Sequence, residues 1–211
     1  MNKKIILINI IVIILVAAVY ISGIYFINYP AQFDLPRMAG ESGLLYLLLI
    51  FAVTALVAFL ISSLNIKNLS FKNKFVRVFP ALNLMVLIFF VYHAAKGFSD
   101  RKKELAQKEN YYIREAAKDI QNDKVSRDYG GGFFIPSYDR KTMNSIDSVR
   151  RQYGIFSNVP GCTVEPMDRK AYEKYTQLTD AYLEKRNGKD WKKRMDKELK
   201  GLKKTKNPQG E

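Results

Sequence analysis

The stretch FPALNLMVLIFFVYHAAKGF, residues 79–98, divides this chain into two parts of different composition. It carries no charge before Lys96 and is long enough to cross the hydrocarbon core of a membrane. Two more uncharged apolar runs precede it, whereas the residues after it are rich in charge. The side of the membrane on which this stretch ends therefore decides which compartment holds the C-terminal half.

The two earlier runs cover 5–26 and 43–64. At about 1.5 Å per residue, each gives a helix of roughly 33 Å, which spans the hydrocarbon core. We therefore predict a three-span transmembrane region over 1–96, with spans at about 5–26, 43–64 and 79–95. A cleaved signal peptide is the alternative for the first run. We prefer an anchor because the run is long and no clear small-x-small site precedes a polar start.

The connections between the spans are short and polar. Residues 28–42 contain Pro30, Pro36 and Gly40, which we expect to break any helix there. Residues 65–78 are expected to form a loop along the lipid headgroups, because phenylalanines alternate with basic residues in it. We expect the third span to begin at about Phe79, with Pro80 in its first turn.

The distribution of positive charge predicts the topology. The start of the chain and the second loop are basic, whereas the first loop has only Arg37. Since basic loops stay inside, we predict a cytoplasmic N-terminus and an extracytoplasmic C-terminal half. The basic residues after the third span oppose this assignment, but long domains translocate largely regardless of charge. These residues are Lys96, Arg101, Lys102, Lys103 and Lys108.

The C-terminal half is expected to leave the membrane. Apolar residues at helical spacing predict a connecting amphipathic helix over 97–122. A small helix-rich α+β soluble domain is predicted over 123–206, with a frayed tail at 207–211. Short strands are expected at 133–135 and 162–164. Helices are expected from about Met143 to a stop at Gly154, over 168–185, and after Asp190, the last with Trp191, Met195, Leu199 and Leu202 on its apolar face.

Several short motifs in this half resemble a known family. They are the helix end VRRQYG at 149–154, Gly161-Cys162 before Val164, Tyr182-Leu183 with Arg186-Asn187-Gly188-Lys189, and Trp191. From Ala116 onward the chain resembles the FEKKY domain, a small bacterial domain family of unestablished function. The helix end departs from the name motif at Val149, Arg150 and Gln152. The resemblance implies an envelope-associated α+β domain and supplies no catalytic residue. Its structural motif residues here are Tyr153, Gly154, Gly161, Cys162, Asn187, Gly188 and Trp191.

Composition excludes several classes of chemistry. A single cysteine, Cys162, allows no intrachain disulfide, and a single histidine, His93, excludes most zinc sites and a histidine-dependent triad in the C-terminal half. The predicted spans lack the charged side chains that ion pathways usually carry, which argues against a pump. We predict no cofactor and no metal site.

The remaining motifs have a structural interpretation beside each functional one. The triple glycine at 130–132 lacks the ending of a phosphate-binding loop and favours a turn. Cys162 has no nearby histidine to activate it, so a buried thiol is favoured. His93 lies where interfacial residues are common, and Asn83 is expected to hydrogen-bond between spans. We expect three aspartates to be solvated charges, namely Asp119, Asp123 and Asp128. We expect Tyr172, Tyr175 and Tyr182 to lie in the core with their hydroxyls reaching water.

The last predicted helix has a basic face. Such a face contacts anionic lipid or another polyanion, or it is only the solvated side of a packed helix. We take its lysines as candidates for contact with an anionic surface. Nucleic acid is disfavoured because the sequence has no recognisable binding motif. The candidate residues are Lys192, Lys193, Lys197, Lys200, Lys203 and Lys204.

Together these observations favour a bacterial inner-membrane protein that displays a small non-catalytic interaction domain. Its partner would be a protein or an envelope component. One alternative is an enzyme, or an enzyme accessory, acting on an envelope polymer. Another is an auxiliary subunit of a membrane complex. The sequence does not fix an oligomeric state.

Overall fold

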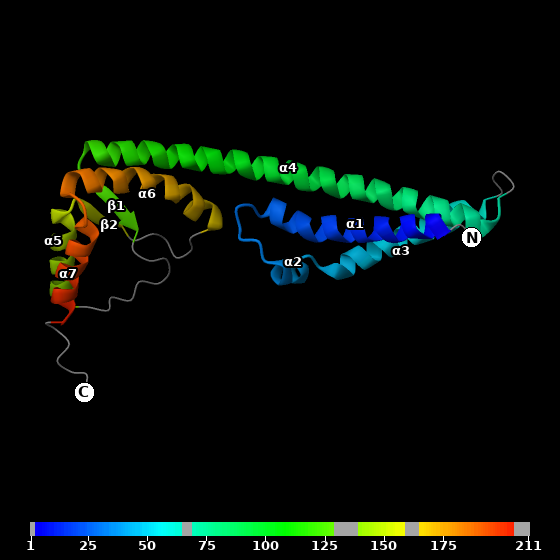
Figure 1. Ribbon diagram of the computed structural model, residues 1–211, viewed down its shortest axis with the longest axis horizontal. Coiled ribbons are helices and arrows are strands. Elements are labelled where there is room, and N and C mark those ends of the chain that lie inside the picture. Colours follow the sequence, from blue (N-terminus) through cyan, green and yellow to red (C-terminus); the bar gives the residue numbers. More distant parts are fainter. Residues whose placement is uncertain (1–2, 65–68, 129–138, 159–164, 205–211) are drawn as a thin grey trace, which may run out of the picture. The chain divides into compact units, whose positions relative to one another are not determined.

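The computed structural model describes residues 3–64, 69–128, 139–158 and 165–204. It divides into two compact units, one ending at Lys103 and one beginning at Glu104. Figure 1 shows the course of the chain along its helices. Because the placement of the two units relative to each other is not determined, we describe each by itself.

Three helices in the described residues are long and apolar enough to cross a membrane. They are α1 (Lys3–Ile27), α3 (Leu44–Ser63) and the first part of α4 (Phe71–Gln121). The first two match the runs predicted at 5–26 and 43–64. Large apolar side chains cover their outer faces, which suits contact with lipid rather than water.

The prediction that the third apolar helix begins at about Phe79, after a loop, is wrong. Helix α4 begins at Phe71, so most of the expected loop is helical and Pro80 lies inside the helix. A proline has no backbone N–H, and the carbonyl of Val76 therefore loses its usual partner four residues later. The Asn9 Nδ2 atom of α1 donates to that carbonyl at 3.0 Å. A neighbouring helix thus supplies the donor that Pro80 lacks, which allows the helix to continue.

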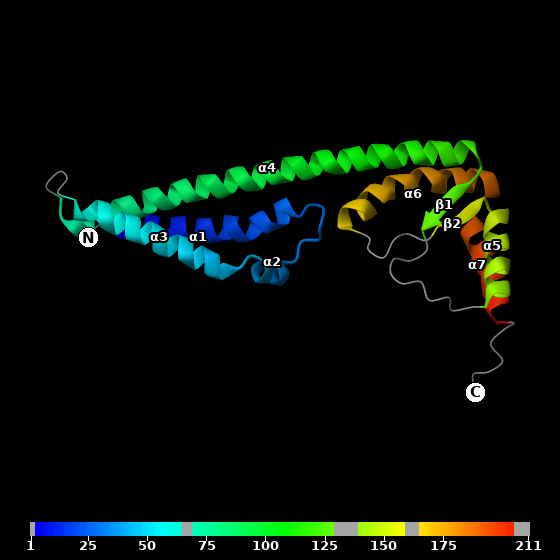
Figure 2. The ribbon, with the colours of Figure 1, turned by 180° about the vertical axis from the view of Figure 1, so that it is seen from behind.

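In the first unit, α1 and α4 form a parallel pair, and α3 packs against α4. Asn9 meets Val76 near one end of α1, and Arg101 Nε donates to the Ile27 carbonyl at 3.1 Å near the other. Helix α1 therefore runs parallel to α4, as Figure 2 shows from behind. Thr54 of α3 donates to the fully buried Asn83 side chain at 3.3 Å, which confirms the hydrogen bond expected between spans.

The first connection contains a short helix that was not expected. Helix α2 covers Leu35–Glu41, with Pro36 in its first turn rather than acting as a breaker. The Asp34 side chain caps it by accepting from the Arg37 backbone N–H at 3.2 Å. An aspartate at the N-cap with a proline in the first turn is a favourable helix start, because the proline's missing donor is not needed there.

In the described residues, the second unit contains the last part of α4, two short strands and three helices. These are β1 (Val125–Asp128), α5 (Arg140–Gln152), β2 (Ile155–Asn158), α6 (Pro166–Asn187) and α7 (Trp191–Lys204). The three helices confirm those expected from the sequence. The two strands form a parallel pair, with Val125 opposite Ile155. The strands predicted at 133–135 and 162–164 lie outside the described residues.

The core of the second unit forms where these elements converge. Val125 and Ile155 are fully buried between α5, α6 and α7, and Leu183 is buried from α6. The predicted apolar face of the last helix is also confirmed, since its residues belong to this core. The buried cluster consists of Ala116, Val125, Ile146, Ile155, Tyr175, Leu183, Trp191, Met195 and Leu199.

Candidate functional site

A polar junction joins the ends of α4, α5 and α6. We use "the junction" for Asp123, Gly154, Arg186 and Asn187. Asp123 follows α4 in the left-handed region at φ 51°, and the turn is closed by Lys124 N donating to Asp119 O at 2.9 Å. This is the hydrogen bond of a helix C-terminus that usually has glycine at the left-handed position. Asp123 occupies it at a conformational cost of about 1 kcal/mol.

An ion pair compensates for that conformation. Arg186 of α6 donates to both carboxylate oxygens of Asp123, at 2.6 and 2.9 Å, and Tyr182 donates to the same carboxylate at 2.8 Å. The Arg186 guanidinium, and then the Tyr182 hydroxyl, hold the pKa of Asp123 below its usual value. Asp123 is exposed, as expected for a solvated charge, but the sequence did not predict this ion pair. The pair ties the end of α4 to the end of α6.

The described residues of the motifs quoted from 149–154 and 182–191 gather at this junction. The Asn187 side-chain amide donates to the Tyr153 carbonyl at 3.0 Å, and Arg186 donates to the Gln152 carbonyl at 3.0 Å. The rings of Tyr153 and Trp191 lie 6.5 Å apart. Gly154 has φ 78°, and its backbone carbonyl accepts from Val125 at 2.9 Å. These motifs therefore meet in space and make contacts between helix ends.

The other motif residues have fewer described contacts here. Gly188, at φ 80°, ends α6, and its backbone N–H donates to the Glu184 carbonyl at 2.8 Å. Gly161 and Cys162 lie outside the described residues, as does the triple glycine at 130–132. Among the described motif residues, the arrangement therefore favours a structural role for the sequence pattern.

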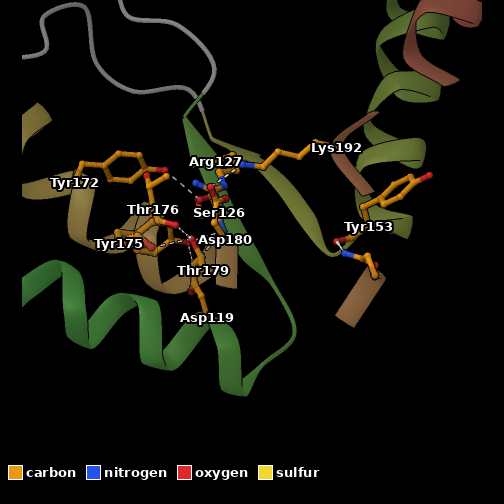
Figure 3. Close-up of polar contacts among 11 residues, drawn as sticks. Asp119, Ser126, Arg127, Tyr153, Tyr172, Tyr175, Thr176, Thr179, Asp180 and Lys192 are labelled. Atoms are coloured by element: carbon orange, nitrogen blue, oxygen red, sulfur yellow. Dashed lines mark hydrogen bonds and ion pairs between the residues drawn. The ribbon is translucent and has the colours of Figure 1, made fainter. Parts of the chain in front are cut away.

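A second polar cluster lies between α4, β1 and α6, and Figure 3 shows it. We use "the Tyr175 cluster" for Asp119, Ser126, Tyr172 and Tyr175. The Tyr175 hydroxyl donates to Asp119 at 2.5 Å and accepts from the Ser126 N–H at 2.8 Å. Asp119 also accepts from the Ser126 N–H at 3.1 Å, and Tyr172 donates to the Ser126 carbonyl at 3.3 Å.

This cluster is a buried support rather than an acid–base pair. Burial, and then the hydrogen bond to Asp119, raise the pKa of Tyr175 far above its usual value, so its hydroxyl stays protonated. The expectation that the Tyr175 hydroxyl reaches water is wrong, because the side chain is buried and bonded to protein atoms. Asp119 is likewise bonded rather than solvated. The cluster provides hydrogen-bond partners for the backbone N–H and carbonyl of Ser126 in β1.

Two basic side chains also pair with one carboxylate of α6. Arg127 of β1 and Lys192 of α7 both pair with Asp180, the latter at 2.6 Å. Figure 3 shows these two cations approaching from different elements. This carboxylate therefore links β1 and α7 to α6.

The surface beside this pair is hollowed. A hollow of about 450 Å³ lies between α6 and α7, lined in part by Asp180, Glu184 and Asp190. Lys192 and Lys193 also line it, and Lys193 pairs with Asp190 at 2.9 Å. Both Asp180 and Asp190 in this hollow are therefore paired with lysines of α7.

The basic face of α7 lies opposite its buried side. Trp191, Met195 and Leu199 are buried, whereas the intervening lysines are exposed. Lys192 and Lys193 have the carboxylate partners described above. Lys197 and Lys200 are exposed beside a shallow hollow of about 520 Å³ along the helix. Lys203 and Lys204 continue the helix to its end.

His93, the histidine candidate in the third span, lies beside the aromatic rings of Phe89 and Tyr92. His93 lies on an exposed part of α4, with its ring 4.3 Å from that of Phe89. In the described residues no group of three or more histidine, cysteine, aspartate or glutamate side chains is placed to hold a metal ion.

The chain matches no known protein-family model, curated protein or solved structure. The resemblance to the FEKKY domain therefore stays a prediction that rests on the residues quoted for it.

Proposed function

We propose that this chain is a bacterial inner-membrane protein that displays a small, non-catalytic α+β interaction domain outside the cytoplasm. The domain, a member of the FEKKY family by this proposal, binds a protein or an envelope component. The observation that carries the proposal is the use of polar groups in the second unit. Its prominent carboxylates hold helix ends and strand edges together, while the lysines of α7 from Lys192 to Lys200 are exposed.

The charges around the first unit support the proposed orientation. Lys3 and Lys4 begin α1, and Lys72 and Lys74 begin the parallel α4, so these four cations mark the same end of the helices. A basic end favours the cytoplasm. Among the opposing cations, Arg101 bonds the last turn of α1 and Lys108 pairs with Asp168, so both have a role in packing.

The binding surface in this proposal is the outward face of α7. Its exposed lysines would attract an acidic protein surface or an anionic envelope polymer. Lys197 and Lys200 are the central contacts because they lie one turn apart and on the same side of the helix as Lys193. The buried side of α7 keeps this face in place through the core of the domain.

Photocrosslinking in living cells tests the proposal with the full chain. A photoreactive residue at Lys197 should give a discrete adduct, whose mass and composition define the partner. The same residue at Lys174, an exposed site on α6, is the matched control and should not. A photoreactive residue at Lys192 should give an adduct as well. That adduct should disappear when the charges of Lys193, Lys197 and Lys200 are all reversed.

Three results would overturn this function. Equal crosslinking from α7 and α6 would mean that α7 has no special surface. Turnover of an envelope polymer by the purified full chain would instead establish the enzymatic alternative. Survival of the Lys192 adduct after reversal of the three charges would show that the basic face does not recognise the partner.

A further inference from the structure

An apolar groove lies between α1 and α4 in the first unit. Its volume is about 310 Å³, and it is lined by Val19, Ser22, Phe26, Val91, Ala94, Ala95 and Phe98. Two small residues of α4, Ala94 and Ala95, leave this space open. Larger side chains at these two positions would fill it. Ala94 packs close to Gly23 of α1, whereas Ala95 is exposed at the groove. The groove therefore opens on a face of the unit that lipid can reach.

One end of the groove is aromatic and basic. The Phe98 ring lies 5.5 Å from Phe26 and 5.0 Å from Tyr29, in edge-on contacts that close the hollow. The Lys102 ammonium lies 5.6 Å from the centroid of the Phe98 ring. Aromatic rings beside a cation are typical of the boundary between the hydrocarbon core and the headgroups. The end near Lys102 thus lies where a headgroup would be.

Helical spacing places the groove and the cation on one stripe. Val91, Ala95, Phe98 and Lys102 follow one another at three or four residues, so they share a face of α4. Arg101 lies on the adjoining part of that face, but its guanidinium donates to the Ile27 carbonyl of α1. Lys102 is exposed and is therefore the cation best placed for an external anion.

We propose that this groove binds one acyl chain of an anionic phospholipid, with Lys102 contacting the phosphate. The apolar walls suit an acyl chain, and the cation at one end suits a negatively charged headgroup. A transmembrane helix from a partner suits it less well. A helix is 10–12 Å wide with its side chains and packs along several turns, whereas the groove covers only the two turns from Val91 to Phe98.

Native mass spectrometry of the full chain in mild detergent tests this site. The probes are phosphatidylglycerol and phosphatidylcholine with identical acyl chains. The intact protein should retain phosphatidylglycerol about fivefold better, as expected for one lysine near a headgroup with a net negative charge. Lys102→Gln should abolish the preference, whereas Lys103→Gln, on the neighbouring exposed lysine, should leave it unchanged.

A second variant tests the acyl chain itself. Ala95→Phe should fill the groove and reduce retention of both lipids at least about threefold. Ala52→Phe, at an exposed alanine of α3, is the matched control and should retain them normally. Equal behaviour of the two phenylalanine variants, or no preference by the intact protein, would overturn the site. A dimer that only Ala95→Phe dissociates, with lipid retention unchanged, would assign the groove to a second copy.

Discussion

Removing the donor that compensates for Pro80 should destabilise the first unit. In Asn9→Leu, the Val76 carbonyl loses the 3.0 Å hydrogen bond from α1 and has no N–H from Pro80 to replace it. Hydrogen bonds between transmembrane helices contribute about 0.6 kcal/mol on average and up to about 1.7 kcal/mol. We expect a loss of about 1 to 1.5 kcal/mol, in the upper part of this range, because the carbonyl is left without either partner.

A double-mutant cycle separates this effect from other consequences of the substitution. The Asn9 amide also donates to the Ile5 carbonyl at 2.8 Å, and that bond is lost whatever occupies position 80. Pro80→Ala restores an N–H within α4, so the Val76 carbonyl regains a partner inside its own helix. In the Pro80→Ala background, Asn9→Leu should therefore cost about 1 kcal/mol less.

The assay is reversible unfolding of the full chain in mixed micelles, followed by helical circular dichroism. All four proteins of the cycle are measured under the same detergent conditions, because the reference state depends on them. Asn83→Leu serves as a control for the assay, since Asn83 makes a different interhelical bond, to Thr54. Strictly additive effects of Asn9→Leu and Pro80→Ala would refute the claim that Asn9 replaces the missing donor.

Three further predictions concern the second unit, with Trp191 fluorescence following chemical unfolding of the full chain. Gly154→Ala should cost about 1–2 kcal/mol, because Gly154 has φ 78° and a Cβ would lie 3.2 Å from Arg186; an unchanged midpoint would contradict this. Asp123→Asn should lower the free energy of unfolding at pH 7. Because Arg186 lowers the pKa of Asp123 in the folded state, the difference in unfolding free energy between Asp123→Asn and the parent should shrink below about pH 4. A constant difference down to pH 2 would exclude the ion pair as its cause. Tyr175→Phe should cost about 1–3 kcal/mol by leaving Asp119 without its hydroxyl donor, and a stabilising effect would oppose the assigned role.

Long patterns in the sequence were sufficient to predict the main helices. Uncharged runs of spanning length predicted α1 and α3, and apolar spacing predicted α5, α6 and α7. Such patterns succeed because each helix must bury or expose a whole face. Pro80 was misread because a proline usually marks a helix start. The donor that permits it inside α4 comes from Asn9, which is distant in sequence.

The polar contacts of the second unit were the hardest to predict. Strand β1 has only four residues, three of them polar, so no alternating apolar pattern marks it. Asp119 and Asp123 are spaced like ordinary helix surface residues, and their partners Tyr175 and Arg186 come from α6. The spacing of three tyrosines along α6 indicated a shared face. It did not indicate which carboxylates that face would meet.

The most direct test of the central claim is the position of the C-terminal half. A phosphatase that is active only outside the cytoplasm, fused after Glu211, should be active in intact cells. The same reporter fused after Ser70, between α3 and α4, should be inactive, and a fluorescent protein that folds only in the cytoplasm should give the reverse pattern at both sites. An inactive phosphatase and a fluorescent fusion after Glu211 would contradict the proposed orientation and place the basic face of α7 in the cytoplasm.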